Sequence, residues 1–299
     1  MSSTSDSAGR NCPLCGERSR SREWLAPRVF KKLSDEEFSS RTRPSRIHPR
    51  FLICEPCDTV YADWALEEAR VLEKYREAPF VSSLESQDAA RTYARLLRQF
   101  GCKRLHRESA LEVGSADGAF LKELGGFGFQ NILGIEPNLM AVQSAESWVQ
   151  ERTLRCSWKE AASSLPEGQK FSLICSFQTL EHSPSPQQWV QGWAGRLRPG
   201  GVLMLAQHDF RSMANRAMGR FSPIYDAQHY QVFSKASLAG LVRASGLQVR
   251  FQSRYLNTYH LSYLGRLLGI SALEKDNRIS KVVQIPFPAG NQVLFAERS

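Results

Sequence analysis

The segment Leu111-Glu112-Val113-Gly114-Ser115-Ala116-Asp117-Gly118-Ala119-Phe120-Leu121 decides the fold of this chain. An apolar run ends at Gly114, small residues follow, and a helix is expected to begin near Gly118. Small residues let a ligand approach the backbone closely, and the N-terminus of a helix offers unpaired N–H donors. The segment therefore predicts a strand, a tight turn and a helix arranged around a ligand.

A second apolar run, Ile132–Ile135, ends in an acidic residue, Glu136. A carboxylate at the end of the second strand of such a unit can accept hydrogen bonds from both hydroxyls of a ribose. The turn and the acid together favour a nucleoside-type ligand. A turn of this kind without a ligand is the competing interpretation, and Glu136 argues against it.

Short apolar runs alternate with helical patterns from Ser109 to the end of the chain. This alternation predicts an α/β fold, doubly wound, with a mostly parallel sheet covered by helices on both faces. The expected strands are 110–113, 132–135, 153–156, 171–177, 202–206, 248–254 and 292–296, and the expected helices are 119–124, 139–150, 186–196 and 235–244.

The turn reads Glu-x-Gly-x-Ala-x-Gly, and in this it resembles motif I of the class I S-adenosylmethionine-dependent methyltransferases. Three later segments resemble that family in the same order: 171–182, which ends in Leu180-Glu181-His182, then 197–203, and 229–234. The resemblance covers roughly residues 105–299. It implies a seven-stranded sheet with an antiparallel last strand, and methyl transfer from S-adenosylmethionine.

The resemblance also implies where the cofactor binds. The residues expected at the cofactor are Glu112, Gly114, Ala116, Gly118, Glu136, Trp158 and Gln178. Ala116 replaces the usual middle glycine of the motif. The acid that often contacts adenine is absent from Cys156-Ser157-Trp158-Lys159, so Trp158 is either a stacking surface for adenine or an ordinary core residue.

Four of the seven cysteines form two Cys-x-x-Cys pairs. Zn²⁺ prefers four tetrahedral ligands, and thiolates are its usual structural ligands. Each pair is expected to form a tight turn, and Gly16 after the first pair suits the positive φ of such turns. The sequence therefore predicts a structural zinc ion, without a catalytic role, bound by Cys12, Cys15, Cys54 and Cys57.

The composition bounds the class of protein. The chain has 299 residues, of which 42% are hydrophobic and 23% charged, which is typical of a globular protein. Four parts are expected: a disordered tail (1–10), a zinc module (11–62), a helical linker or lid (63–108) and a methyltransferase domain (109–299). We expect a cytoplasmic protein, because no apolar run is long enough to span a membrane and the polar N-terminus is unlike a signal peptide.

The acceptor of the methyl group is less well defined. Histidine can remove a proton near neutral pH, and the candidates are His229 first, then His182 and His208, with Tyr225 and Tyr230 as helpers. A zinc module before this fold resembles the C-methyltransferases of sugar and natural-product pathways, which implies an enolate nucleophile. The net charge of +9, concentrated in residues 200–299, favours a small anionic metabolite.

Two other functions remain open. Some ribosomal RNA methyltransferases also combine a zinc module with this fold, but the basic residues form no dense stripe here, so nucleic acid is the less favoured partner. The third interpretation is a catalytically inactive protein that binds the cofactor and a protein partner. O- and N-methylation of a small molecule also stay open.

Overall fold

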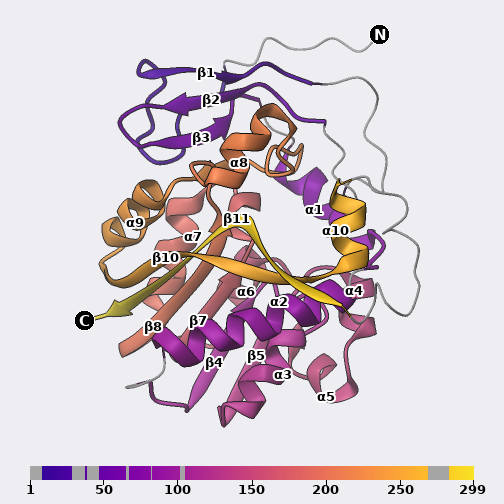
Figure 1. Cartoon of the computed structure of the whole chain (residues 1–299). Helices are drawn as coiled ribbons and strands as arrows, with labels where there is room; N and C mark the ends of the chain where they lie inside the picture. Colours follow the sequence, from indigo (N-terminus) through magenta and orange to yellow (C-terminus); the bar gives the residue numbers. More distant parts are fainter. Residues whose placement is uncertain are drawn as a thin grey trace.

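The computed structural model describes residues 9–28, 38, 47–64, 67–81, 83–101, 105–268 and 283–299. Figure 1 shows the central sheet with helices around it and a smaller sheet at the N-terminal side. The strands are β1 (Ser21–Leu25), β2 (Phe51–Cys54), β3 (Thr59–Ala62), β4 (Ser109–Val113), β5 (Asn131–Ile135), β6 (Thr153–Leu154), β7 (Phe171–Phe177), β8 (Leu197–His208), β9 (Gln231–Phe233), β10 (Leu247–His260) and β11 (Gln284–Arg298).

The α-helices lie around the central sheet (Figure 1). They are α1 (Glu68–Glu77), α2 (Ser83–Leu96), α3 (Ala119–Gly126), α4 (Leu139–Ser144), α5 (Ser147–Gln150), α6 (Trp158–Ser164), α7 (Pro186–Gly195), α8 (Met213–Met218), α9 (Lys235–Ala244) and α10 (Leu261–Leu268). Helix α2 continues into a π-helical turn, η2 (Leu97–Gly101), and two 3₁₀ turns are η3 (Leu180–His182) and η4 (Gly219–Phe221). None of the described helices is both long and apolar enough to cross a membrane.

The seven strands of the central sheet lie in the order β10-β11-β8-β7-β4-β5-β6. Strands β4 to β8 pair in parallel, whereas β11 is antiparallel to both β8 and β10. The predicted doubly wound fold and its antiparallel last strand are confirmed. The strand order reverses between β4 and β7, and ligands of open α/β sheets bind in the crevice outside the carboxyl ends of the strands at such a point.

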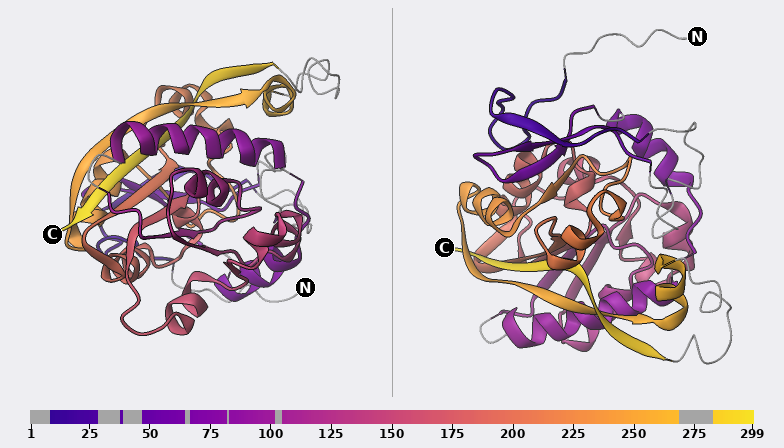
Figure 2. Two further views of the ribbon diagram at one scale, coloured as in Figure 1. Left: turned by 90° about the horizontal axis from the view of Figure 1, so that it is seen from below. Right: turned by 45° about the horizontal axis from the view of Figure 1, so that its top comes forward.

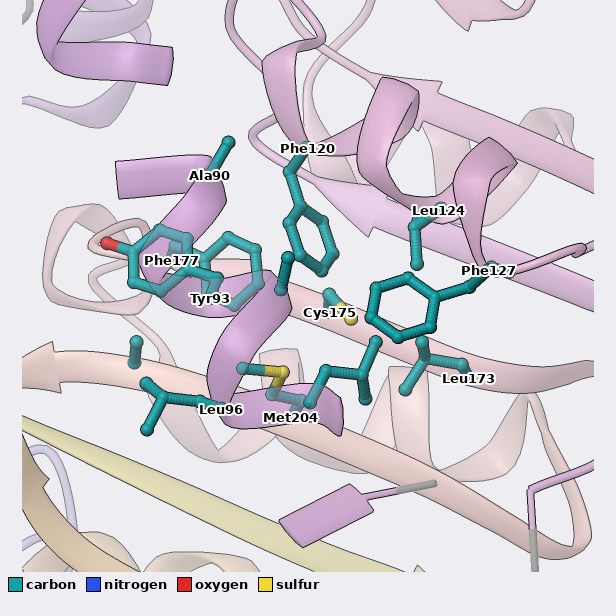
Figure 3. Close-up of a cluster of buried hydrophobic side chains, with 14 of the residues drawn as sticks. Ala90, Tyr93, Leu96, Phe120, Leu124, Phe127, Leu173, Cys175, Phe177 and Met204 are labelled. Carbon is teal, nitrogen blue, oxygen red and sulfur yellow. The ribbon is translucent and has the colours of Figure 1, made fainter. Parts of the chain in front are cut away.

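Two apolar layers hold the sheet between helices. Strand β7 is buried along its whole length, and its side chains alternate between the layers: Leu173, Cys175 and Phe177 face α2 and α3, whereas Ile174 faces α7. This explains why β7 reads as a continuous apolar run. Figure 3 shows Tyr93 of α2 and Phe120 of α3 beside Phe177, and the rings of Tyr93 and Phe177 stack at 3.9 Å between centroids.

A four-stranded sheet, β1-β2-β3-β9, contains the N-terminal segment. Strands β2 and β3 form an antiparallel hairpin around the second Cys-x-x-Cys pair, with Phe51 opposite Ala62 and Cys54 opposite Thr59. Strand β9 comes from the C-terminal half of the chain and pairs with β3 through Val60 and Val232. Sequence reasoning missed β1, whose side chains are mostly polar or exposed, and β9, which has only three residues.

Other boundaries differ from the expectation. The helix predicted at 139–150 is two helices, because the backbone is extended at Ala145 and Glu146. Strands β10 and β11 are longer than predicted and pair with each other as far as His260 and Gln284. Figure 2 shows this long hairpin curving beside α2 and reaching α10.

The predicted disordered tail falls mostly on residues 1–8, which lie outside the described residues. Arg10, the last residue of that segment, forms hydrogen bonds with distant parts of the chain. The guanidinium of Arg10 donates hydrogen bonds to the backbone oxygens of Tyr230 (2.6 Å) and Pro184 (2.7 Å). Arg10 thus contacts the segment that carries His229.

Candidate functional site

The turn between β4 and α3 has the backbone that its small residues allow. Gly114 and Gly118 have φ of +82° and +69°, and Ala116 has φ of +48°. A Cβ atom at Gly114 would lie 2.3 Å from Oγ1 of Thr179, and one at Gly118 would lie 2.2 Å from Cγ1 of Val149. Glycine at both positions is therefore required by the backbone and by its neighbours. Ala116 adopts the same left-handed region at some cost in strain.

Glu136 is bound to this turn by two backbone amides. Its Oε2 accepts from the N–H of Ala116 (2.9 Å), and its Oε1 accepts from the N–H of Asn138 (2.8 Å). Burial raises the pKa of Glu136 to about 7, although both amides and the hydroxyl of Tyr75 favour the charged carboxylate. A carboxylate has about four acceptor sites: the two amides use two of them, and the Tyr75 hydroxyl shares the others with any hydroxyl donor of a ligand.

A cavity of about 550 Å³ opens at the carboxyl ends of the parallel strands. Five of the predicted cofactor residues line it: Gly114, Ala116, Glu136, Trp158 and Gln178. Glu112 is buried in β4, and Gly118 is buried as the N-cap of α3, and neither lines the cavity. The cavity lining thus includes five of the seven predicted cofactor residues and does not include Glu112 or Gly118.

Helix α1 covers one side of the cavity. Glu68, Val71, Leu72 and Tyr75 all contribute to the lining. The side chain of Asn138 donates to the backbone oxygens of Tyr75 (2.6 Å) and Ala78 (2.9 Å), which ties the end of α1 to the residue after Glu136. On the surface, Arg76 pairs with Glu160 of α6. Helix α1, which lies within the segment expected to be a linker or lid, therefore forms part of the cavity wall.

Three histidine rings lie close together in the cavity lining. The ring of His229 is 4.7 Å from that of His182 and 5.7 Å from that of His208, measured between centroids. All three line the cavity. Burial, followed by the nearby His229 and His208, lowers the pKa of His182 to about 3. This disfavours His182 as the base that the sequence suggested.

Tyr225 occupies a different place from the one expected. Its side chain is buried among Phe51, Ile53, Ile224 and other residues of the N-terminal sheet, and it does not line the cavity. Its hydroxyl accepts a hydrogen bond from Nε1 of Trp24, and burial raises its pKa to about 12. Tyr230, the other helper considered, does line the cavity.

Sequence reasoning missed the side of the cavity formed by the C-terminal hairpin. The contributing residues are Asn257 and Tyr259 of β10, Tyr263 of α10, and Phe287, Ala289 and Asn291 of β11. It also gave no role to Glu181, although this acid stands between Leu180 and His182 at the end of a buried strand. A buried acid beside a histidine at that position was the available signal.

The four predicted zinc ligands converge. Their sulfur atoms all lie within 4.8 Å of one another, and Sγ of Cys15 is 3.8 Å from Sγ of Cys54. Each pair is followed by a residue with positive φ, Gly16 at +77° and Asp58 at +51°. The N–H of Leu14 also points to Sγ of Cys12 at 3.5 Å. This set of four thiols around one point fits a tetrahedral metal ion.

Comparison with known proteins agrees with the geometry. Residues 85–252, more than half of the chain, match the model of a protein family described as "Methyltransferase domain". The chain belongs to this family, and it is an S-adenosylmethionine-dependent methyltransferase. No curated protein matches its sequence.

Two solved structures show the same fold. One is a Bacillus halodurans C-125 protein assigned to the methyltransferases, with a TM-score of 0.50 and 14% identity, covering 69% of this chain and 98% of that chain. The other is the (4+2)-cyclase SpnF, with a TM-score of 0.51 and 16% identity, covering 78% of this chain and 97% of that chain. At these identities the similarity concerns the fold alone.

Proposed function

We propose that this enzyme transfers a methyl group to a small organic molecule enclosed in the cavity. The observation that carries this proposal is that the motif I turn and the three histidines line one cavity of about 550 Å³. Cavities of this size suit small molecules. A polynucleotide would need an open basic surface, and the described lining contains no Lys or Arg.

The cofactor occupies the end of the cavity formed by Gly114, Ala116 and Glu136. In this proposal the ionised Glu136 accepts the ribose hydroxyls, and the ring of Trp158 lies beside the adenine. Gln178, which has φ of +51° after β7, also lines the cavity. Glu112 in β4 and Gly118 at the start of α3 hold the turn in position without contacting the cofactor.

The acceptor occupies the end formed by the histidines and the C-terminal hairpin. Aromatic residues are frequent there: Phe177, Tyr230, Tyr259, Tyr263 and Phe287. The acids Glu68, Glu136 and Asp226 line the cavity, but no Lys or Arg among the described residues does. This composition favours an uncharged acceptor with an apolar or aromatic body over the anionic metabolite suggested by the net charge.

The histidines provide the polar chemistry at this end. Nδ1 of His229 contacts the backbone oxygen of Ile224 at 2.8 Å. A carbonyl oxygen only accepts, so Nδ1 carries the proton and Nε2 keeps its lone pair. A hydroxyl or an enolisable ketone next to Nε2 would be a suitable methyl acceptor, and C-methylation through an enolate belongs to this set.

We also propose that the four-Cys cluster holds a structural zinc ion. Four thiolates would leave no coordination position for a substrate, so the ion would stabilise the fold of the N-terminal sheet and take no part in methyl transfer.

The test incubates the purified protein with methyl-labelled S-adenosylmethionine and a cell extract divided into a metabolite fraction and an RNA fraction. We expect label in a small molecule, detected by mass spectrometry, and no label with Gly114→Ala. Label in the RNA fraction alone would contradict the proposal.

A further inference from the structure

Three side chains come together beside the cavity. Glu181 of η3, His208 at the end of β8 and His229 before β9 each place one ligand atom within 4.8 Å of the other two. We propose that Glu181, His208 and His229 bind a divalent metal ion, at a site separate from the four-Cys cluster.

The two histidines are held in the orientation that metal binding needs. Nδ1 of His208 contacts Oδ1 of Asn291, and Nδ1 of His229 contacts the backbone oxygen of Ile224, both at 2.8 Å. Oxygen atoms accept these protons, so both rings keep a lone pair on Nε2. Metal-binding histidines commonly donate their other ring N–H to an oxygen in this way.

Glu181 supplies the negative charge. The residue is 1% exposed, and neither carboxylate oxygen has a hydrogen-bond partner among the described residues. Leaving a buried carboxylate without a partner is costly, and a bound cation would remove that cost.

A proton relay through the same residues fits the geometry less well. Oε1 of Glu181 lies 3.6 Å from Nε2 of His208, which is longer than the roughly 2.6–3.2 Å that direct proton transfer requires. The spacing leaves room between acceptor atoms that would otherwise repel one another. One carboxylate and two imidazoles suit divalent ions such as Mn²⁺, Fe²⁺, Co²⁺ or Zn²⁺.

The position of the site suggests a role, and this part rests on the proposed function. His208 and His229 line the cavity, so the remaining coordination positions would face the acceptor. A bound ion lowers the pKa of a coordinated hydroxyl. The acceptor oxygen would lose its proton to solvent and attack the methyl carbon, and the C–S bond would break to leave S-adenosylhomocysteine. His229 would then act as a ligand instead of a base.

The test uses the full chain with zinc already bound. Mn²⁺ is titrated into this protein and followed by electron paramagnetic resonance and calorimetry, because Mn²⁺ competes poorly with Zn²⁺ for thiolates. We expect one Mn²⁺ per chain, and at least tenfold weaker binding in Glu181→Gln. The matched control is Glu68→Gln, which makes the same change in an acid of the cavity lining outside the proposed metal site and should leave Mn²⁺ affinity unchanged.

Absence of Mn²⁺ binding, or equal binding by wild type and Glu181→Gln, would overturn the proposal. If Glu181→Gln does not fold, as judged by circular dichroism, His208→Gln takes its place with the same expectation. S-adenosylhomocysteine binding is measured in parallel. If the wild-type protein binds Mn²⁺ but does not bind S-adenosylhomocysteine, the proposed function is contradicted and the metal site stands.

Discussion

The indole Nε1 of Trp24 donates a hydrogen bond to the hydroxyl of Tyr225 at 2.8 Å, joining residues 201 positions apart. Trp24 belongs to β1 beside the four-Cys cluster, and Tyr225 lies in the loop that leads to His229. The ring of Tyr225 also packs against Phe51 of β2 at 5.5 Å between centroids. The N-terminal sheet therefore supports the loop that brings His229 to the cavity lining.

Tyr225→Phe tests whether this residue is structural. We expect the variant to lose about 1 kcal/mol of unfolding free energy, because the indole N–H of Trp24 loses its acceptor. S-adenosylhomocysteine affinity should stay within about twofold of wild type, because Tyr225 does not line the cavity. Chemical denaturation and calorimetry measure the two quantities. Normal stability with lost turnover would instead restore the catalytic role predicted from the sequence.

Glu136 should make stability depend on pH. Its folded pKa is about 7, above the ordinary 4.5, so the folded protein binds this proton more tightly than the unfolded chain. The resulting stability is fully present below pH 4.5 and is lost as the pH rises through about 7. Relative to Glu136→Gln, wild type should lose on the order of 3 kcal/mol over this window, measured by denaturation at several pH values. Parallel pH profiles of the two proteins would refute this.

The same carboxylate should make cofactor binding depend on pH. Ribose hydroxyls donate to the charged form, so wild type should bind S-adenosylhomocysteine more tightly as the pH rises through about 7. Glu136→Gln should bind at least tenfold more weakly at pH 8 and show a flat profile, as it lacks the charged acceptor. Calorimetry across this range decides, and equal affinities at pH 8 would count against the ribose contact.

Two glycine substitutions compare the turn at Gly114 with an exposed position in helix α7. Gly114→Ala places a Cβ 2.3 Å from Oγ1 of Thr179 at a φ of +82°, so we expect a loss of about 2 kcal/mol and no cofactor binding. Gly192 lies on an exposed position of α7 with nothing near an added Cβ. Gly192→Ala should gain about 0.5–1 kcal/mol. Thermal unfolding of both variants checks the opposite signs.

Removing one thiol should remove the zinc. Cys12→Ser is expected to bind less than one metal ion per chain and to unfold at a lower temperature, because three thiolates hold the ion more weakly. Cys156→Ser changes a cysteine outside the cluster and should retain the metal. Elemental analysis of the purified proteins measures the content, and zinc-free wild type with unchanged stability would exclude a structural ion.

Much of the fold could be predicted because its signals are local. Strand β7 is apolar along its full length, and the turn at Gly114 and Gly118 needs glycine for reasons of backbone conformation alone. The four cysteines could be grouped because two short turns carry them. Such features are set by neighbours in the sequence.

The rest depends on contacts between distant segments. Tyr225 reads as a helper of His229, but the packing of β1 and β2 takes it out of the cavity. The lining residues Asn257, Tyr259, Phe287, Ala289 and Asn291 come from a hairpin whose extension depends on pairing between β10 and β11. Glu181 gains its interest only when His208 and His229 are brought beside it. No local pattern encodes these approaches.

The pairing of β3 with β9 also bears on how the protein can be divided. A fragment that starts after Ala62 would leave β9 without its partner, exposing the unpaired backbone groups of Gln231–Phe233 together with Phe210, Ile224 and Val232. Free strand edges next to apolar surface promote self-association. Shortened versions that lack this region should therefore aggregate, because the N-terminal sheet covers the edge of β9 and the apolar residues beside it.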